Sequence, residues 1–323
     1  MAVMVSVACG SSGGGTPTSL TGTTTPVTTL VSAPTLDSSS PYGVCAVTAA
    51  SSTQRPDLTV QVIPEGDPLY GLFTKCIKTF GMSHLANDSF SDEKLQHVAT
   101  IAAEYLDNHE DGMPDDLATN AALARNHAVM MLTRDAWERD AIRRRSDMTA
   151  GDQKPLDYIE VQQGQYADET NAAGTLCGPD CGTLSDASLE EVLHLIQTAG
   201  YADAHQNLSP WPKGRRTTLL TEAMDVARGG KFQTTPATYP EAAWYHYNDT
   251  TCEYRCMAVE YFYWGLTTYL GAQGDLNPIR CRMIEDEWEP CTKAQFQATD
   301  TRLYELVTNP RYNLPSRLPD GSY

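Results

Sequence analysis

The spacing of hydrophobic residues predicts that helices make up most of the chain. Between Asp92 and Leu106, apolar residues recur every three or four positions, which is the spacing of one face of a helix. The same spacing predicts further helices over residues 118–137, 185–200, 217–228 and 251–270. Gly200 and Gly271 stand at the ends of two of these segments, where a glycine commonly terminates a helix.

Two short segments alternate between apolar and polar residues and are predicted to be strands. They cover residues 58–63 and 157–163, and a period of two is typical of a strand with one buried face. Because strands are few and helices many, we expect an α+β fold that is mainly helical with a small sheet.

The N-terminal segment has the composition of a disordered linker. Residues 10–40 are almost all Gly, Ser, Thr, Pro, Ala, Val and Leu, with Asp37 as the single charge. Such a segment buries too little apolar surface to offset its chain entropy. We therefore expect a stalk over residues 10–41 and one globular domain over 42–323, with a sub-boundary near residue 150.

Cys9 follows Ser6, Val7 and Ala8 and precedes Gly10. Small residues before a cysteine and a Gly/Ser/Thr-rich segment after it resemble the processing site of bacterial lipoproteins, although Ser6 stands where leucine is usual. The resemblance implies a signal remnant over residues 1–9, a lipid on Cys9 that anchors the chain to a membrane, and an extracytoplasmic location at the cell surface or in the periplasm. The alternative is the remnant of an ordinary cleaved signal peptide, and hence a secreted protein.

The remaining eight cysteines predict a disulfide framework. Their number is even, and three pairs are close in sequence, namely Cys177/Cys181, Cys252/Cys256 and Cys281/Cys291, which leaves Cys45 and Cys76. In an exported chain this pattern predicts four disulfides, while the pairing itself stays open. A zinc site is disfavoured because the tight pairs, Cys177/Cys181 and Cys252/Cys256, have CxxxC rather than CxxC spacing.

Net charge narrows the choice of partners. The chain carries 41 acidic and 23 basic residues, for a net charge of −18. The electrostatic field of so much negative charge repels phosphate backbones, so nucleic acid is not expected as a partner.

An acidic segment resembles the D-x-D-x-D-G calcium loop of EF-hand-like proteins. Asp107, Asp111 and Asp115 occupy its positions one, five and nine, His109 stands at position three, and Gly112 follows Asp111. We therefore expect a calcium site of modest affinity built from Asp107, His109, Asp111 and Asp115. The alternative is an acidic loop that ends a helix and binds no ion.

The segment Glu190-Glu191-Val192-Leu193-His194 places two candidate metal ligands on one helix face. Residues four apart on a helix lie side by side, so Glu190 and His194 can hold one ion. The competing interpretation is structural: Ser188 and Glu191 form a capping box, and His194 is a core histidine.

This E-E-x-x-H segment resembles the H-E-x-x-H helix of zincin peptidases, with Glu190 in place of the first histidine. Downstream, Cys256-Met-Ala-Val-Glu260-Tyr-Phe-Tyr-Trp264 is similar to the second helix of gluzincins, in particular the anthrax lethal factor type. The resemblance covers residues 155–270 and implies a zincin-like domain. It implies that Glu190, His194 and Glu260 bind the metal and that Glu191 is the general base of a hydrolase acting on peptides or proteins.

The same resemblance implies an oxyanion-stabilising phenol, for which the candidates are Tyr245, Tyr247 and Tyr254. A Glu-His-Glu set is more anionic than His-His-Glu and favours harder ions such as Mn, Fe or Ca over Zn. A di-iron bundle is disfavoured because no second E-x-x-H exists, and an α/β-hydrolase because no G-x-S-x-G elbow joins a strand to a helix. Two hypotheses remain: a lipid-anchored, metal-dependent hydrolase, and a non-catalytic surface binding module with a degenerate metal site.

Overall fold

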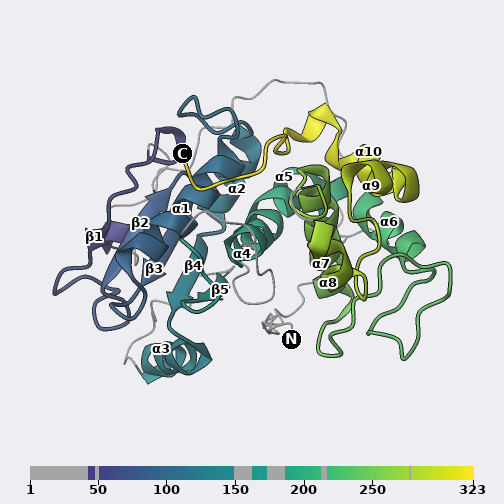
Figure 1. Cartoon of the computed structure of the whole chain (residues 1–323). Helices are drawn as coiled ribbons and strands as arrows, with labels where there is room; N and C mark the ends of the chain where they lie inside the picture. The colour runs from purple at the N-terminus through teal and green to yellow at the C-terminus, as the bar shows by residue number, and fades with distance from the viewer. Residues whose placement is uncertain (1–42, 48–50, 149–161, 173–185, 212–216, 276–277) are drawn as a thin grey trace, which may run out of the picture.

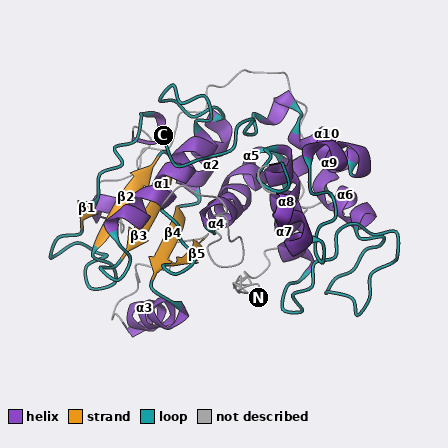
Figure 2. Ribbon diagram, viewed as in Figure 1, coloured by secondary structure: helices purple, strands orange, loops and turns teal. Residues whose placement is uncertain are grey.

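One five-stranded sheet forms one side of the molecule and a group of helices forms the other (Figure 1 and Figure 2). The structure is a computed structural model that describes residues 43–47, 51–148, 162–172, 186–211, 217–275 and 278–323. Its strands are β1 (Gln61–Val62), β2 (Lys75–Thr79), β3 (Met82–Ala86), β4 (Ala128–Thr133) and β5 (Gln162–Tyr166).

The sheet runs in the order β1-β2-β3-β4-β5, antiparallel up to β3 and parallel from β3 to β5. Parallel neighbours need a crossover, and α1 (Asp92–Leu106) and α2 (Leu117–Arg125) supply one between β3 and β4. The fold is therefore mixed α/β with helix dominant. β5 lies at the edge of the described sheet.

The two faces of the sheet bury different clusters. α1 and α4 (Ser188–Leu195) cover the face that belongs to the main core, and α3 (Ala136–Met148) packs on the other face. Because side chains alternate along a strand, β3 sends Met82 and Ala86 into the main core and Leu85 into the smaller one.

The helical half is built around α7 (Tyr254–Tyr269), which is buried along most of its length. A helix that is apolar on all sides is typical of a protein interior. Around it lie α6 (Leu219–Ala227), α8 (Pro278–Ile284), α9 (Lys293–Thr299) and α10 (Thr301–Val307) (Figure 1). One buried cluster runs from Ile77 to Tyr312, so the sheet and these helices share a core. No helix in the described ranges is long and apolar enough to cross a membrane.

Several predicted helices are confirmed. α1 spans Asp92–Leu106 as expected, and α6 and α7 lie within their predicted segments. Gly271, with φ +84°, follows the C-cap residue Leu270 and ends α7 in the left-handed conformation that glycine adopts readily.

The single helix predicted over residues 118–137 is wrong. That stretch contains all but the first residue of α2, the whole of β4 and the first two residues of α3. All six residues of Ala128–Thr133 are buried. A strand buried on both faces has a continuous apolar run, which spacing alone does not distinguish from a buried helix.

The helix stop predicted at Gly200 is also wrong. After α4 the chain continues as a π-helix over Ile196–Tyr201 and then as α5 (Ala202–Ala204). A Cβ atom at Gly200 would lie 2.8 Å from Thr119 Cγ2. Glycine is therefore needed here because α2 packs closely against the π-helix.

Three of the expected disulfides join Cys45 to Cys76, Cys252 to Cys256 and Cys281 to Cys291. The fourth expected pair, Cys177/Cys181, lies outside the described residues, as do Cys9, the stalk and the sub-boundary near residue 150. Strand β1 covers only part of the strand predicted over residues 58–63. Strand β5 begins at the end of the strand predicted over residues 157–163, and the earlier residues of that segment lie outside the described ranges.

Candidate metal centre

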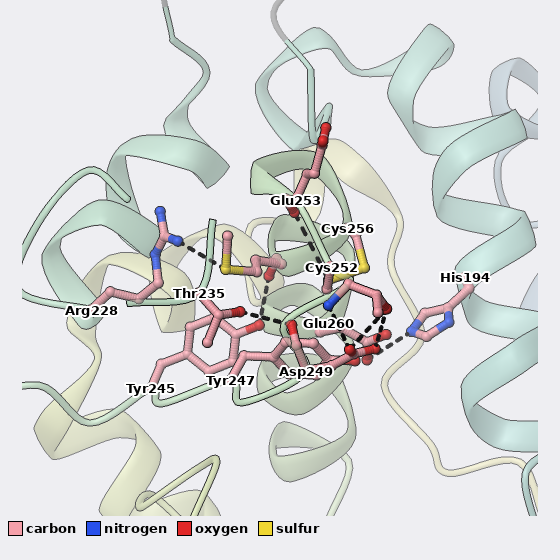
Figure 3. Close-up of a disulfide and its surroundings, with 12 residues drawn as sticks. His194, Arg228, Thr235, Tyr245, Tyr247, Asp249, Cys252, Glu253, Cys256 and Glu260 are labelled. Atoms are coloured by element: carbon pink, nitrogen blue, oxygen red, sulfur yellow. Dashed lines mark hydrogen bonds and ion pairs between the residues drawn. A yellow bond between two sulfur atoms is a disulfide. The ribbon is translucent and has the colours of Figure 1, made fainter. Parts of the chain in front are cut away.

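Glu190 and His194 of α4 meet Glu260 of α7 where the two helices pack together. One ligand atom from each side chain lies within 4.8 Å of the other two, and no other group of His, Cys, Asp or Glu side chains in the described ranges does so. His194 Nε2 is 3.4 Å from Glu260 Oε2, and Figure 3 shows the imidazole pointing across to Glu260. The three residues singled out from the sequence therefore converge.

Both helices are held in place close to these residues. The Cys252–Cys256 disulfide spans the start of α7, one turn before Glu260 (Figure 3). On the other side, Tyr105 of α1 donates a hydrogen bond to the carbonyl of Leu189, at the start of α4. The ligand positions therefore lie on braced segments of helix.

The imidazole of His194 is buried without a hydrogen bond. The residue is 2% exposed, Glu260 is 6% exposed, and neither ring nitrogen of His194 has a hydrogen-bond partner among the described residues. Buried polar atoms in folded proteins are nearly always paired. An unpaired imidazole facing two carboxylates has the donor set of a cation site.

The electrostatics of the group also favour a cation. Burial and the charge of Glu260 raise the pKa of Glu190 to about 8, although His194 and Arg280 oppose the shift. Burial lowers the pKa of His194, but the carboxylates of Glu260 and Glu191 outweigh it and hold that pKa well above its usual value. Glu190 and His194 therefore both favour a bound proton, and a divalent ion would take the place of those protons.

Further polar groups surround the triad without having been predicted. Burial and the charge of Glu260 raise the pKa of Glu287 to about 7, and the charge of Arg280 acts in the opposite direction. Arg280 donates through Nε to Gln273. Neither residue belongs to a recognisable motif, so only the fold could bring them to the site.

Glu191 does not form the predicted capping box. The N-cap of α4 is Ala187, without a side-chain cap, and Ser188 Oγ donates to Asp186 Oδ1. The Glu191 carboxylate, 2% exposed, accepts a hydrogen bond from the side-chain amide of Gln163 on β5 and lies 3.8 Å from His194 Nδ1. Its role as general base stays a prediction.

The three candidate tyrosines differ in their surroundings. Tyr245 donates to the carbonyl of Met257, and Tyr254 donates to the Asp225 carboxylate, so both phenols are already engaged. The Tyr247 hydroxyl makes no hydrogen bond in the described part of the chain. Burial and the charge of Glu260 raise its pKa, and it lies beside Glu260 in Figure 3. The charge of Glu260 also raises the pKa of Tyr245. Tyr247 differs from Tyr245 in that its hydroxyl is not already engaged among the described residues.

The acidic loop is organised by its own hydrogen bonds. The fully buried carboxylate of Asp107 accepts from the backbone N–H groups of Asp111 and Gly112 and from the Tyr323 hydroxyl. The other two carboxylates are also engaged: Asp115 pairs with His109 and accepts from the Asn108 N–H, and Asp111 accepts from the Met113 N–H. The structure does not gather these groups as it gathers the triad, and calcium binding stays a prediction.

Comparisons with protein-family models, curated proteins and solved structures gave no match. The functional argument therefore depends on the geometry and chemistry of the site.

Proposed function

We propose that this chain is a metal-binding protein whose divalent ion is held by Glu190, His194 and Glu260. The observation that supports the proposal most strongly is the convergence of these three ligand atoms within 4.8 Å around a buried, unpaired imidazole. Two carboxylates and one imidazole suit harder ions such as Mn, Fe or Ca better than Zn.

We further propose that the domain is a zincin-like hydrolase acting on peptides or proteins. Support comes from the helix pair that presents the ligands, from the sheet beneath α4, and from Tyr247 beside Glu260. A bound ion would polarise the scissile carbonyl, and the Tyr247 hydroxyl would stabilise the negative charge that develops on the carbonyl oxygen.

The competing function is a non-catalytic, metal-stabilised surface module. It is favoured by Glu191, because a carboxylate buried against Gln163 is poorly placed to take a proton from water. For either function we propose an extracytoplasmic location with a lipid on Cys9. The three disulfides support an oxidising compartment.

Calorimetric titration of chelator-treated protein with Mn²⁺, Zn²⁺ and Ca²⁺ tests the metal site. We expect one ion per chain, and Glu260→Gln should weaken binding by at least about a hundredfold because it removes a charged ligand. Glu253→Gln is the matched control, since Glu253 begins the same helix and its side chain makes no cap. Equal binding by Glu260→Gln and wild type would refute the site.

Hydrolysis is tested separately with a mixture of peptides and the metal-loaded protein. The hydrolase predicts cleavage that requires metal and is lost in Glu260→Gln. Metal binding without any cleavage would leave the surface module as the function.

A further inference from the structure

The edge strand β5 contacts the metal-site helix through two glutamine side chains. Alternation along the strand points Gln163 and Gln165 to the same face of the sheet. Gln165 donates to Ser188 Oγ in the first turn of α4, and Gln163 donates to the Glu191 carboxylate one turn later. β5 therefore fixes the position of the Glu191 side chain.

The His194 ring lies between two carboxylates. Glu260 is nearest to Nε2, at 3.4 Å, and Glu191 is nearest to Nδ1, at 3.8 Å. A histidine that binds a metal through one ring nitrogen usually donates the N–H of the other to a carboxylate or carbonyl, which fixes the ring's orientation and tautomer. Glu191 occupies the position of that acceptor.

We infer that Glu191 is a positioning residue that, with an ion bound at Nε2, closes the 3.8 Å separation and accepts from Nδ1–H of His194. The inference rests on the proposed metal site and assigns Glu191 a role other than general base. Gln163 completes the arrangement: its amide donates to Glu191 and holds the carboxylate at the ring. Gln163, Glu191 and His194 are 7%, 2% and 2% exposed, so water competes little for these contacts.

Three variants separate positioning from a general charge effect. Glu191→Gln removes the charged acceptor, and the amide of the new side chain then faces the amide of Gln163. This variant should bind metal ten- to a hundredfold more weakly. Gln163 is not a metal ligand, but Gln163→Leu removes the hydrogen bond that holds the Glu191 carboxylate. Metal binding should therefore weaken about tenfold, because His194 is no longer oriented. Glu169→Gln is the control, because Glu169 follows β5 but accepts from the Tyr166 N–H instead of contacting His194.

The experiment uses full-length protein loaded with Co²⁺, with affinity measured by calorimetry and the exchangeable imidazole proton followed by paramagnetic NMR. In wild type and Glu169→Gln we expect one ring N–H that exchanges slowly with solvent. In Glu191→Gln and Gln163→Leu that proton should exchange quickly, alongside the loss of affinity.

The outcomes keep this inference distinct from the metal site itself. Wild-type affinity and slow exchange in both Glu191→Gln and Gln163→Leu would overturn the positioning role while leaving the metal site intact. Unchanged affinity with loss of cleavage alone in Glu191→Gln would make Glu191 the general base. If wild-type protein binds no Co²⁺, the proposed metal site fails, and the inference fails with it. Gln163→Leu still decides the question if Glu191→Gln does not fold.

Discussion

The acidic loop over residues 107–115 and the helix pair α4 and α7 both contain carboxylates and a histidine, but the hydrogen bonds of these groups differ between the two regions. In the loop, the carboxylates of Asp107 and Asp115 accept backbone N–H groups and pair with Tyr323 and His109. In the helix pair, the carboxylates of Glu190 and Glu260 face a buried imidazole that makes no hydrogen bond with any described residue.

This difference separates structural carboxylates from candidate ligands. A buried carboxylate that accepts several N–H groups is already stabilised in its charged form. One that faces another carboxylate and an unpaired imidazole is not, and gains from a cation. A row of acidic residues in the sequence looks equally promising in both cases, whereas the donors around each carboxylate distinguish them.

The largest expected effect comes from a third region, where another histidine is buried without carboxylates. His84 on β3 is fully buried, neither of its ring nitrogens has a hydrogen-bond partner in the described part of the chain, and burial lowers its pKa to about 3. The His84 ring takes up a proton near pH 6.5 in the unfolded chain but only near pH 3 in the folded chain. The free energy of unfolding is therefore highest above pH 6.5 and decreases as the pH falls from 6.5 towards 3. The loss is roughly 5 kcal/mol over that window.

His84→Leu removes this titration. Urea unfolding between pH 7 and pH 4 should show a flatter pH dependence for the variant, and metal affinity should not change. Equal acid sensitivity in both proteins would contradict the assignment. If His84→Leu lost metal binding, then the buried imidazole of His84, which faces no carboxylate among the described residues, could no longer be distinguished from that of His194.

The second effect concerns the loop. Asp107→Ala leaves the N–H groups of Asp111 and Gly112 and the Tyr323 hydroxyl without their acceptor. The free energy of unfolding measured in urea should fall by about 4 kcal/mol. Asp111→Ala is the control: Asp111 is exposed and, among the described residues, accepts only the Met113 N–H, so about 0.5 kcal/mol is expected. Similar losses in the two variants would show that Asp107 is not the organising residue.

The third effect is stabilisation by metal. An ion present at a hundred times its Kd stabilises the native state by about 2.7 kcal/mol, which raises Tm by about 5 °C in a domain of this size. We expect Mn²⁺ to produce this shift in wild type and Asp111→Ala but not in Glu260→Gln. A shift that survives Glu260→Gln and disappears in Asp111→Ala would place the ion in the loop.

The smallest effect should be that of calcium on the loop. Because its carboxylates already accept hydrogen bonds within the chain, we expect calcium to raise Tm by less than about 1 °C in Glu260→Gln, where the triad no longer contributes. Melting curves of that variant in millimolar Ca²⁺ measure the loop alone. A shift of several degrees would show that the loop rearranges into the calcium site predicted from its sequence.

The sequence was most informative where periodicity and spacing are local. The i, i+4 spacing of Glu190 and His194 on one helix was enough to place them together, and the similarity around Glu260 identified the helix that meets them. The sheet was less predictable, since β4 is apolar throughout and β5 has a polar, glutamine-rich sequence. The partner of Glu191 could not be predicted either, because Gln163 reaches it only through the register of the edge strand.

Metal-edge anomalous diffraction from crystals grown with Mn²⁺ or Zn²⁺ would locate a bound ion without reference to activity. We expect a single strong peak between α4 and α7, with Zn²⁺ about 2.0–2.2 Å from oxygens of Glu190 and Glu260 and from Nε2 of His194. A peak in the acidic loop instead, or no peak at the triad, would contradict the proposed metal site.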